Sequence, residues 1–236
     1  MTDLSNAFAA PFLKLERAKH HLAELEASLV EFFATPVPIS RFEPWQNADG
    51  TWGMEIASEP HDPPPMTATI LGDIIHNLRS SLDLMACALA LQRGESPDGV
   101  HFPFAGEEDD LDLMIRKRRF NLCGEDAVRL LKTLRPYKGG NLELRAIHDL
   151  DIIDKHRSLV PKPDAMFHVE FPQLGEQPDG RLILGKPYIA NRGTPSLTAP
   201  DDWGVGSRPV VETLKDLVEL CESILKAFVA LKASPE

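Results

Sequence analysis

Apolar residues recur three and four positions apart over long parts of the chain, which is the pattern of helices that bury one face. The spacing predicts helices over residues 8–34, 67–92, 107–157 and 208–232. The third range contains three shorter predicted helices, at 107–119, 124–134 and 141–157. Thr67 or Thr69 is expected to cap the start of the second helix, and Gly94 is expected to end it.

Two other segments have the residue alternation and the turn residues of antiparallel strands. Residues 39–58 form a predicted β-hairpin with an Asp-Gly turn, and Pro44 is expected to place one of its strands at a sheet edge. Residues 166–190 form a second predicted hairpin, which can join the first in one sheet. We expect the large aromatic side chains of the first hairpin to pack on the bundle or on the second hairpin: Phe42, Trp45 and Trp52.

The composition is that of a globular protein with ample length for a hydrophobic core. The chain has 236 residues, of which 43% are hydrophobic and 26% are charged. The long helices near the two ends are expected to pack on one bundle. We therefore predict an α+β fold in a single domain over residues 1–236, a predominantly helical bundle with two small antiparallel β-hairpin elements.

Several features favour a cytoplasmic protein. Every stretch of about 18 residues carries a charge, and the first residues lack the basic and then apolar pattern of a secretory signal. The three cysteines, Cys87, Cys123 and Cys221, lie too far apart for a zinc or redox motif, so we expect reduced, buried thiols. We expect no membrane contact, no bound metal and no cofactor, since phosphate-loop, dinucleotide and hydrolase-elbow motifs are all missing from the sequence.

Charge is distributed unevenly along the chain. The net charge is −11, which argues against indiscriminate nucleic-acid binding. Residues 116–157, however, contain 11 Lys and Arg against 6 Asp and Glu. The basic run at 116–119 has two interpretations, a solvated helix face or a surface that meets phosphate groups.

Two of the predicted helices pair an apolar stripe with a strip of polar side chains. The strip of the helix at 67–92 consists of Asp73, His76, Asn77, Arg79, Ser80 and Asp83. The strip near the end of the helical region at 107–157 consists of Arg145, His148, Asp151, Lys155, His156 and Arg157. If the stripes pack together, the strips converge, and at least one side-chain hydrogen bond or ion pair is expected between the two helices. The strips are then either a ligand site or a network that fixes helix register.

The same residues carry a resemblance to a known group of proteins. The segments "LGDIIHNLRSSLDLMACALA", "LRPYKGG" and "LRAIHDLDIIDKHR" resemble uncharacterised bacterial and phage proteins that share a GD-x-x-HNLRS-x-LD helix and an L-x-x-DKHR helix. More distantly, the helical layout is similar to the HEPN superfamily, whose members bind nucleotides or RNA. Many of them are ribonucleases that use an Arg and a His four to six residues later, a spacing that the two motif helices of this chain do not have.

Two functions are compatible with these observations. The first is a helical binding module without catalysis, directed to RNA, a nucleotide or a protein partner. The alternative is a metal-independent ribonuclease or other phosphate-directed enzyme that uses His76 or His148 with an arginine of the strips. A homodimer is also compatible, because Leu71, Leu78 and Leu82 fit a dimer surface as well as an internal core.

Overall fold

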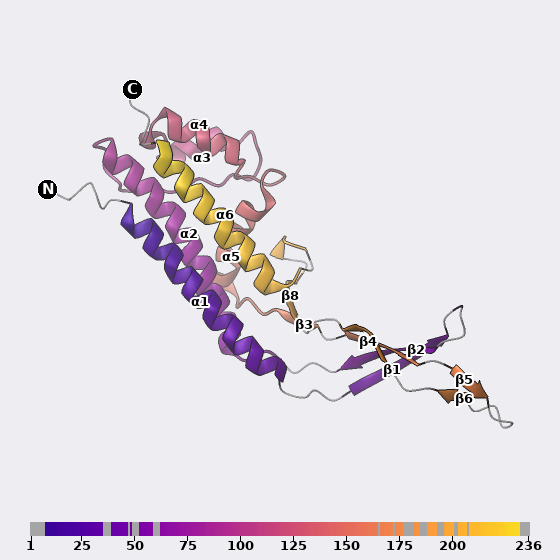
Figure 1. The fold of residues 1–236 in the computed structure, drawn as a ribbon. Coiled ribbons are helices and arrows are strands. Elements are labelled where there is room, and N and C mark those ends of the chain that lie inside the picture. The colour runs from indigo at the N-terminus through magenta and orange to yellow at the C-terminus, as the bar shows by residue number, and fades with distance from the viewer. Residues whose placement is uncertain are drawn as a thin grey trace. The chain divides into compact units, whose positions relative to one another are not determined.

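Figure 1 shows the computed structural model of the chain, in which the contacts form two compact units. The structure describes residues 8–34, 39–46, 48, 52–58, 62–164, 166–171, 173–176, 182–184, 188–192, 196–200, 203–206 and 208–231. One unit comprises residues 1–28, 65–160 and 199–236, and the other comprises 29–64 and 161–198. We expected a single domain. The β segments form a unit of their own because their backbone hydrogen bonds run between the strands themselves.

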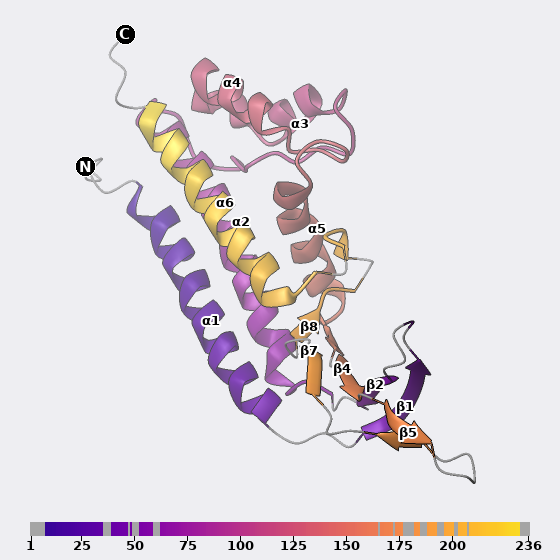
Figure 2. The ribbon, with the colours of Figure 1, turned by 45° about the vertical axis from the view of Figure 1, so that its right-hand side comes forward.

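The protein is mostly helical, and four long helices lie where the apolar spacing predicts them. They are α1 (Ala9–Ala34), α2 (Met66–Gln92), α5 (Leu142–His156) and α6 (Val210–Ala230). Helices α1, α2 and α6 run side by side in both views (Figures 1 and 2). Leu71, Leu78 and Leu82 are fully buried within this unit, so they belong to an internal core. Each helix in the described part of the chain is either too short or too polar to span a bilayer.

Shorter helices complete the helical unit near the end of α2. They are α3 (Leu111–Lys117), a 3-10 helix η2 (Phe120–Cys123) and α4 (Glu125–Leu134). The helix predicted over 107–119 is shorter in the structure, where α3 spans Leu111–Lys117 and the acidic residues 107–110 precede it. The segment Val100–Ala105 is extended and places an aromatic cluster in the core, made of Phe102, Phe104, Phe120 and Phe228.

Both predicted hairpin regions contain antiparallel strands. The main sheet has the order β1 (Ile39–Gln46), β2 (Trp52–Ser58), β4 (Met166–Phe171), β7 (Tyr188–Arg192). Two further pairs are β3 (Lys162–Asp164) with β8 (Ser196–Thr198), and β5 (Gln173–Glu176) with β6 (Leu182–Leu184). Pro44 lies in the edge strand β1, as predicted. The side chains of Phe42 and Trp45 lie outside the described part of the structure, so their predicted packing stays a prediction. The side chain of Trp52 is half-buried.

The ends of α2 test two predictions about capping. Gly94 has a φ of +77° directly after the C-cap residue Arg93, so it ends the helix as predicted. The prediction that Thr67 or Thr69 caps the start is wrong. The helix begins at Met66 after Pro65, which has helical dihedral angles, so both threonines lie inside the first turn.

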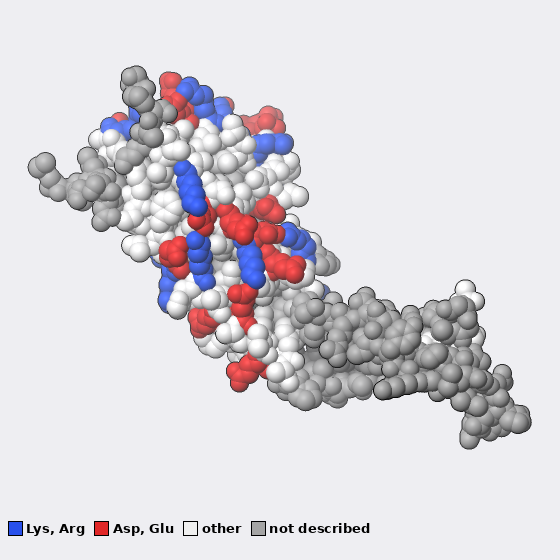
Figure 3. Space-filling model, in the orientation of Figure 1, with Lys and Arg blue, Asp and Glu red and all other residues white. Residues whose placement is uncertain are grey.

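Ion pairs tie α1 to α6 along one face of the helical unit. Lys19 Nζ lies 2.8 Å from Glu222, and Lys215 Nζ lies 2.6 Å from Glu26. Figure 3 shows acidic and basic side chains interleaved on this face. Because its cations have carboxylate partners, this face presents no continuous basic surface among the described residues.

Candidate functional site

The two polar strips meet where α2 packs against α5. The Nδ1 atom of His76 lies 3.3 Å from Oδ1 of Asp151, which confirms the predicted bond between the helices. Gly72 permits the close approach, since a Cβ atom at this position would collide with the carboxylate of Asp154. A side chain at position 72 would therefore require the carboxylate of Asp154 to shift.

Arg79 and Asp83 bind the backbone of the segment Val100–Ala105 at Phe102. Arg79 Nη2 donates to the carbonyl of Phe102 at 3.1 Å, and Asp83 Oδ1 accepts from the Phe102 amide at 2.8 Å. The two side chains form an ion pair at 3.0 Å, and the guanidinium lies over the ring of Phe104. Burial lowers the pKa of Arg79, and the charge of Asp83 opposes that shift. This pair is part of the architecture.

Arg145 and His148 also contact the segment Val100–Ala105. Arg145 Nη1 donates to the carbonyl of Ala105 at 2.7 Å and pairs with both oxygens of Asp149. The ring of His148 stacks on Phe104 with the two centroids 4.7 Å apart and the planes 5° from parallel. Burial, followed by the charges of Arg79 and Arg145, lowers the pKa of His148 to about 4. His148 is therefore a neutral packing residue at physiological pH and not an exposed base.

His76 remains at the surface, where it forms a small cluster with α5. Its side chain is 53% exposed, whereas Asp151 is buried and also accepts a hydrogen bond from Lys155. On the other side of the ring, Nε2 lies 3.4 Å from Ser80 Oγ. The cluster consequently aligns a hydroxyl, an imidazole and a buried carboxylate, which is an arrangement that can hold and move a proton.

The His76 cluster has an excess of carboxylates. Asp73 and Asp154 accompany Asp151, while Lys155 supplies one permanent positive charge. Burial raises the pKa of Asp154, and the neighbouring charges of Asp151 and Asp73 act in the same direction. This electrostatic environment disfavours a phosphate group unless His76 is protonated.

The remaining strip residues have different surroundings. Asn77 is buried, donates to the Asp73 carbonyl at 2.7 Å and accepts from Lys14 of α1 at 3.2 Å. His156 and Arg157 are exposed at the end of α5, where Arg157 leaves the helical conformation. Their assignment to a ligand site stays a prediction.

The basic run occupies the end of α3. Residues 116–119 are all exposed, and in the described part of the chain none of the four forms an ion pair with a carboxylate. The backbone carbonyl of Arg118 accepts from the amide of His101 at 3.0 Å, and the guanidinium of Arg119 donates to the carbonyl of Asp98. His101 is exposed and lies 3.7 Å from Asp83. His101 therefore links the basic run to Asp83, so the run lies next to the Asp83 end of the α2 strip.

No family model matches the chain, and neither the curated proteins nor the solved structures that were compared with it provide a match. The site is consequently interpreted from its own geometry. Asp151 and Ser80 belong to the predicted polar strips but were not among the predicted binding residues, and Phe104 was in neither set. Asp151 is marked in the sequence by its spacing of four from Lys155, but its bond to His76 joins positions 75 residues apart.

The Arg79–Asp83 pair predicts a large loss of stability in Asp83→Ala. The substitution leaves a nearly buried guanidinium and the Phe102 amide without their acceptor, so we expect the free energy of unfolding to fall by about 1–3 kcal/mol. Urea unfolding followed by circular dichroism measures the change. The control, Asp73→Ala on the exposed side of the same helix, should change it by less than about 0.5 kcal/mol. Equal effects of the two substitutions would contradict the structural role of Asp83.

The pKa of His148 predicts a loss of stability in acid. The folded pKa of about 4 lies below the ordinary value of 6.5, so the unfolded chain binds the proton first. This histidine therefore destabilises the native state progressively as the pH falls from 6.5 to about 4, and has no such effect above 6.5. We expect His148→Leu to gain melting temperature relative to wild type across that window. A His20→Asn control, at an exposed site on α1, should follow the wild-type curve. A constant offset between wild type and His148→Leu at every pH would contradict the assignment.

Proposed function

We propose that the protein is a helical binding module without catalysis that contacts the phosphate groups of RNA or a nucleotide through residues 116–119 and His101. The observation that carries the proposal is the run of four exposed cations that lack carboxylate partners among the described residues. The chain as a whole has a charge of −11, so this local concentration of positive charge stands out.

A local basic surface acts on a phosphate despite the negative total. Exposed charges are screened over about 8 Å at physiological ionic strength, so distant carboxylates contribute little. The nearby carboxylate of Asp112 pairs with Lys132 at 2.7 Å and interacts with Arg116 only at longer range. Arginine binds phosphate oxygens with two parallel N–H groups, and three of the four residues in the run are arginines.

Hydrogen bonds fix the backbone of the basic run, so less conformational entropy is lost when a ligand binds. The carbonyl of Arg118 is tied to His101, and Arg119 has a φ of +53° with its side chain on the Asp98 carbonyl. The resemblance to the HEPN superfamily supports the same ligand class. The absence of that Arg-to-His spacing from the two motif helices and the half-buried, neutral His148 support binding without cleavage.

Neutralising the basic run should weaken RNA binding. The test variant carries Arg116→Gln, Lys117→Gln, Arg118→Gln and Arg119→Gln. The matched control removes four cations that already have carboxylate partners and lie away from Asp112: Lys19→Gln, Arg129→Gln, Lys215→Gln and Lys226→Gln. Fluorescence anisotropy with a labelled single-stranded RNA, repeated over a salt series, is expected to show at least about tenfold weaker binding and a shallower salt dependence for the test variant alone. A wild-type protein that does not bind, or equal losses in both variants, would overturn the proposal. Parallel titrations with a labelled nucleotide separate the two ligands.

A second candidate function is metal-independent cleavage of RNA or of another phosphate ester. It is favoured by one observation, the exposed His76 whose ring is oriented by the buried Asp151 beside Lys155. In this mechanism His76 takes the proton of the attacking hydroxyl, and Lys155 faces the phosphate. The carboxylates around His76 oppose phosphate binding while His76 acts as a base, so this candidate ranks second.

Incubation of the full chain with mixed RNA and a chelator tests this second candidate. Cleavage that survives the chelator, is lost in His76→Ala and is retained in His20→Ala would establish it. Intact RNA under these conditions would eliminate it, and the binding proposal would be unaffected.

A further inference from the structure

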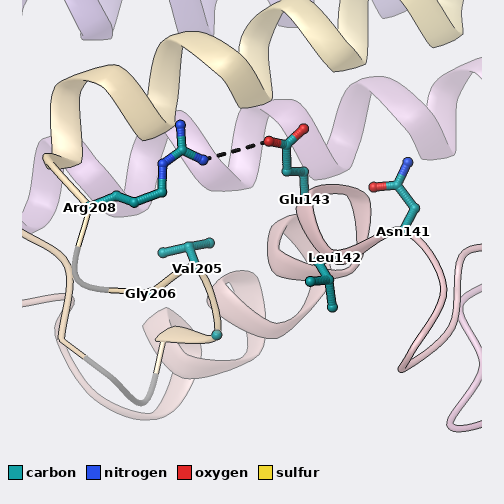
Figure 4. Close-up of a pocket in the computed structure, with 7 residues that line it drawn as sticks. Asn141, Leu142, Glu143, Val205, Gly206 and Arg208 are labelled. Carbon is teal, nitrogen blue, oxygen red and sulfur yellow. Dashed lines mark ion pairs between the residues drawn. The ribbon is translucent and has the colours of Figure 1, made fainter.

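A hollow of about 500 Å³ lies in the helical unit between the first turn of α5 and the loop that precedes α6. Figure 4 shows the residues that line it. Asn141, Leu142 and Glu143 form one wall, and the segment Gly204–Gly206 with Arg208 forms the other. A volume of this size is in the range that small-molecule ligands occupy in proteins. The hollow shares no residue with the His76 cluster or the basic run.

Both walls of the hollow are anchored. Asn141 caps α5 by accepting the Leu144 amide at 2.9 Å. On the other wall, the side chain of Trp203 is buried, and the Arg208 amide donates to the Gly206 carbonyl at 2.8 Å. The carbonyl of Arg208 accepts from Ala199 at 3.0 Å. Hydrogen bonds and the buried indole of Trp203 fix both walls, so the hollow is preformed.

Opposite charges stand side by side in the hollow with aliphatic side chains below them (Figure 4). Arg208 Nη1 lies 3.6 Å from Glu143 Oε1, which is longer than a hydrogen bond, and both side chains are nearly half exposed. The aliphatic groups are Val205 and Leu142, and Leu142 is 64% exposed. An exposed leucine beside a loose ion pair leaves apolar surface that a ligand can cover.

The balance of charge selects among ligand classes. Arg208 also pairs with Asp216, so two carboxylates surround one guanidinium. A simple anion would meet this excess of negative charge, and a simple cation bound to Glu143 would compete with Arg208 for that carboxylate without replacing it. A molecule with adjacent positive and negative groups matches both. We propose that the hollow binds a zwitterion of the α-amino acid class, with its ammonium on Glu143, its carboxylate on Arg208 and an aliphatic side chain against Val205 and Leu142.

Titration of the full chain with L-leucine and two truncated analogues tests the proposal without any mutation. Isopentylamine lacks the carboxylate, and 4-methylvalerate lacks the ammonium group. Isothermal titration calorimetry is expected to show saturable binding of L-leucine, with each analogue at least about tenfold weaker. Equal binding of either analogue would overturn the zwitterion assignment. The absence of saturable L-leucine binding up to about 10 mM would overturn the site.

Two charge-neutral substitutions locate the binding site. Glu143→Gln and Arg208→Gln should each weaken L-leucine binding at least about tenfold, while the control Lys226→Gln on α6 should bind as wild type does. Circular dichroism and urea unfolding verify that the variants are folded. Unchanged affinity in either pocket variant would place L-leucine elsewhere and overturn the proposal. These outcomes are independent of RNA binding, because the basic run is not altered.

Discussion

The hydrogen bonds that Arg79 and Asp83 make with the backbone of Phe102 hold the extended segment Val100–Ala105 against α2. The aromatic core depends on this placement, because Phe102 and Phe104 enter the core from that segment. Arg145 of α5 binds the carbonyl of Ala105, so arginines from both polar strips support the same segment. Burying a guanidinium is unfavourable unless it has such partners. Arg79 and Arg145 are therefore structural residues and not merely solvated side chains on a helix surface.

This role divides the polar strips into two parts with different consequences. The part around Arg79, Asp83 and Arg145 satisfies backbone groups that have no partner in a regular element. The part around His76 is exposed and is oriented by a buried carboxylate. Residue types that look alike in the sequence are thus structural where they are buried with backbone partners, and available for chemistry where one side faces solvent.

The distribution of charge gives the exposed features different local electrostatic environments. The end of α3 concentrates positive charge without carboxylate partners in the described chain, which suits a phosphate. The His76 cluster and the hollow beside Arg208 both contain more carboxylates than permanent cations. A single net charge for the protein therefore hides three local environments, and ligand preference follows the local one because screening limits the range of each charge.

The sequence by itself determined the four long helices, the β1–β2 hairpin, the β segments within 166–190 and the meeting of the two polar strips, but not the β3–β8 pair. Apolar spacing defines which face of an element is buried, as at Leu78 and Leu82, and a proline or an Asp-Gly pair defines where a strand lies or turns. Only the tertiary structure decided that His148 stacks on Phe104, that His76 bonds Asp151 and that Glu143 faces Arg208. The physical reason is that periodicity records the direction of a side chain around its own helix, whereas its partner depends on how distant segments cross. Burial changed the chemistry of His148, and no local pattern in the sequence records burial by a remote ring.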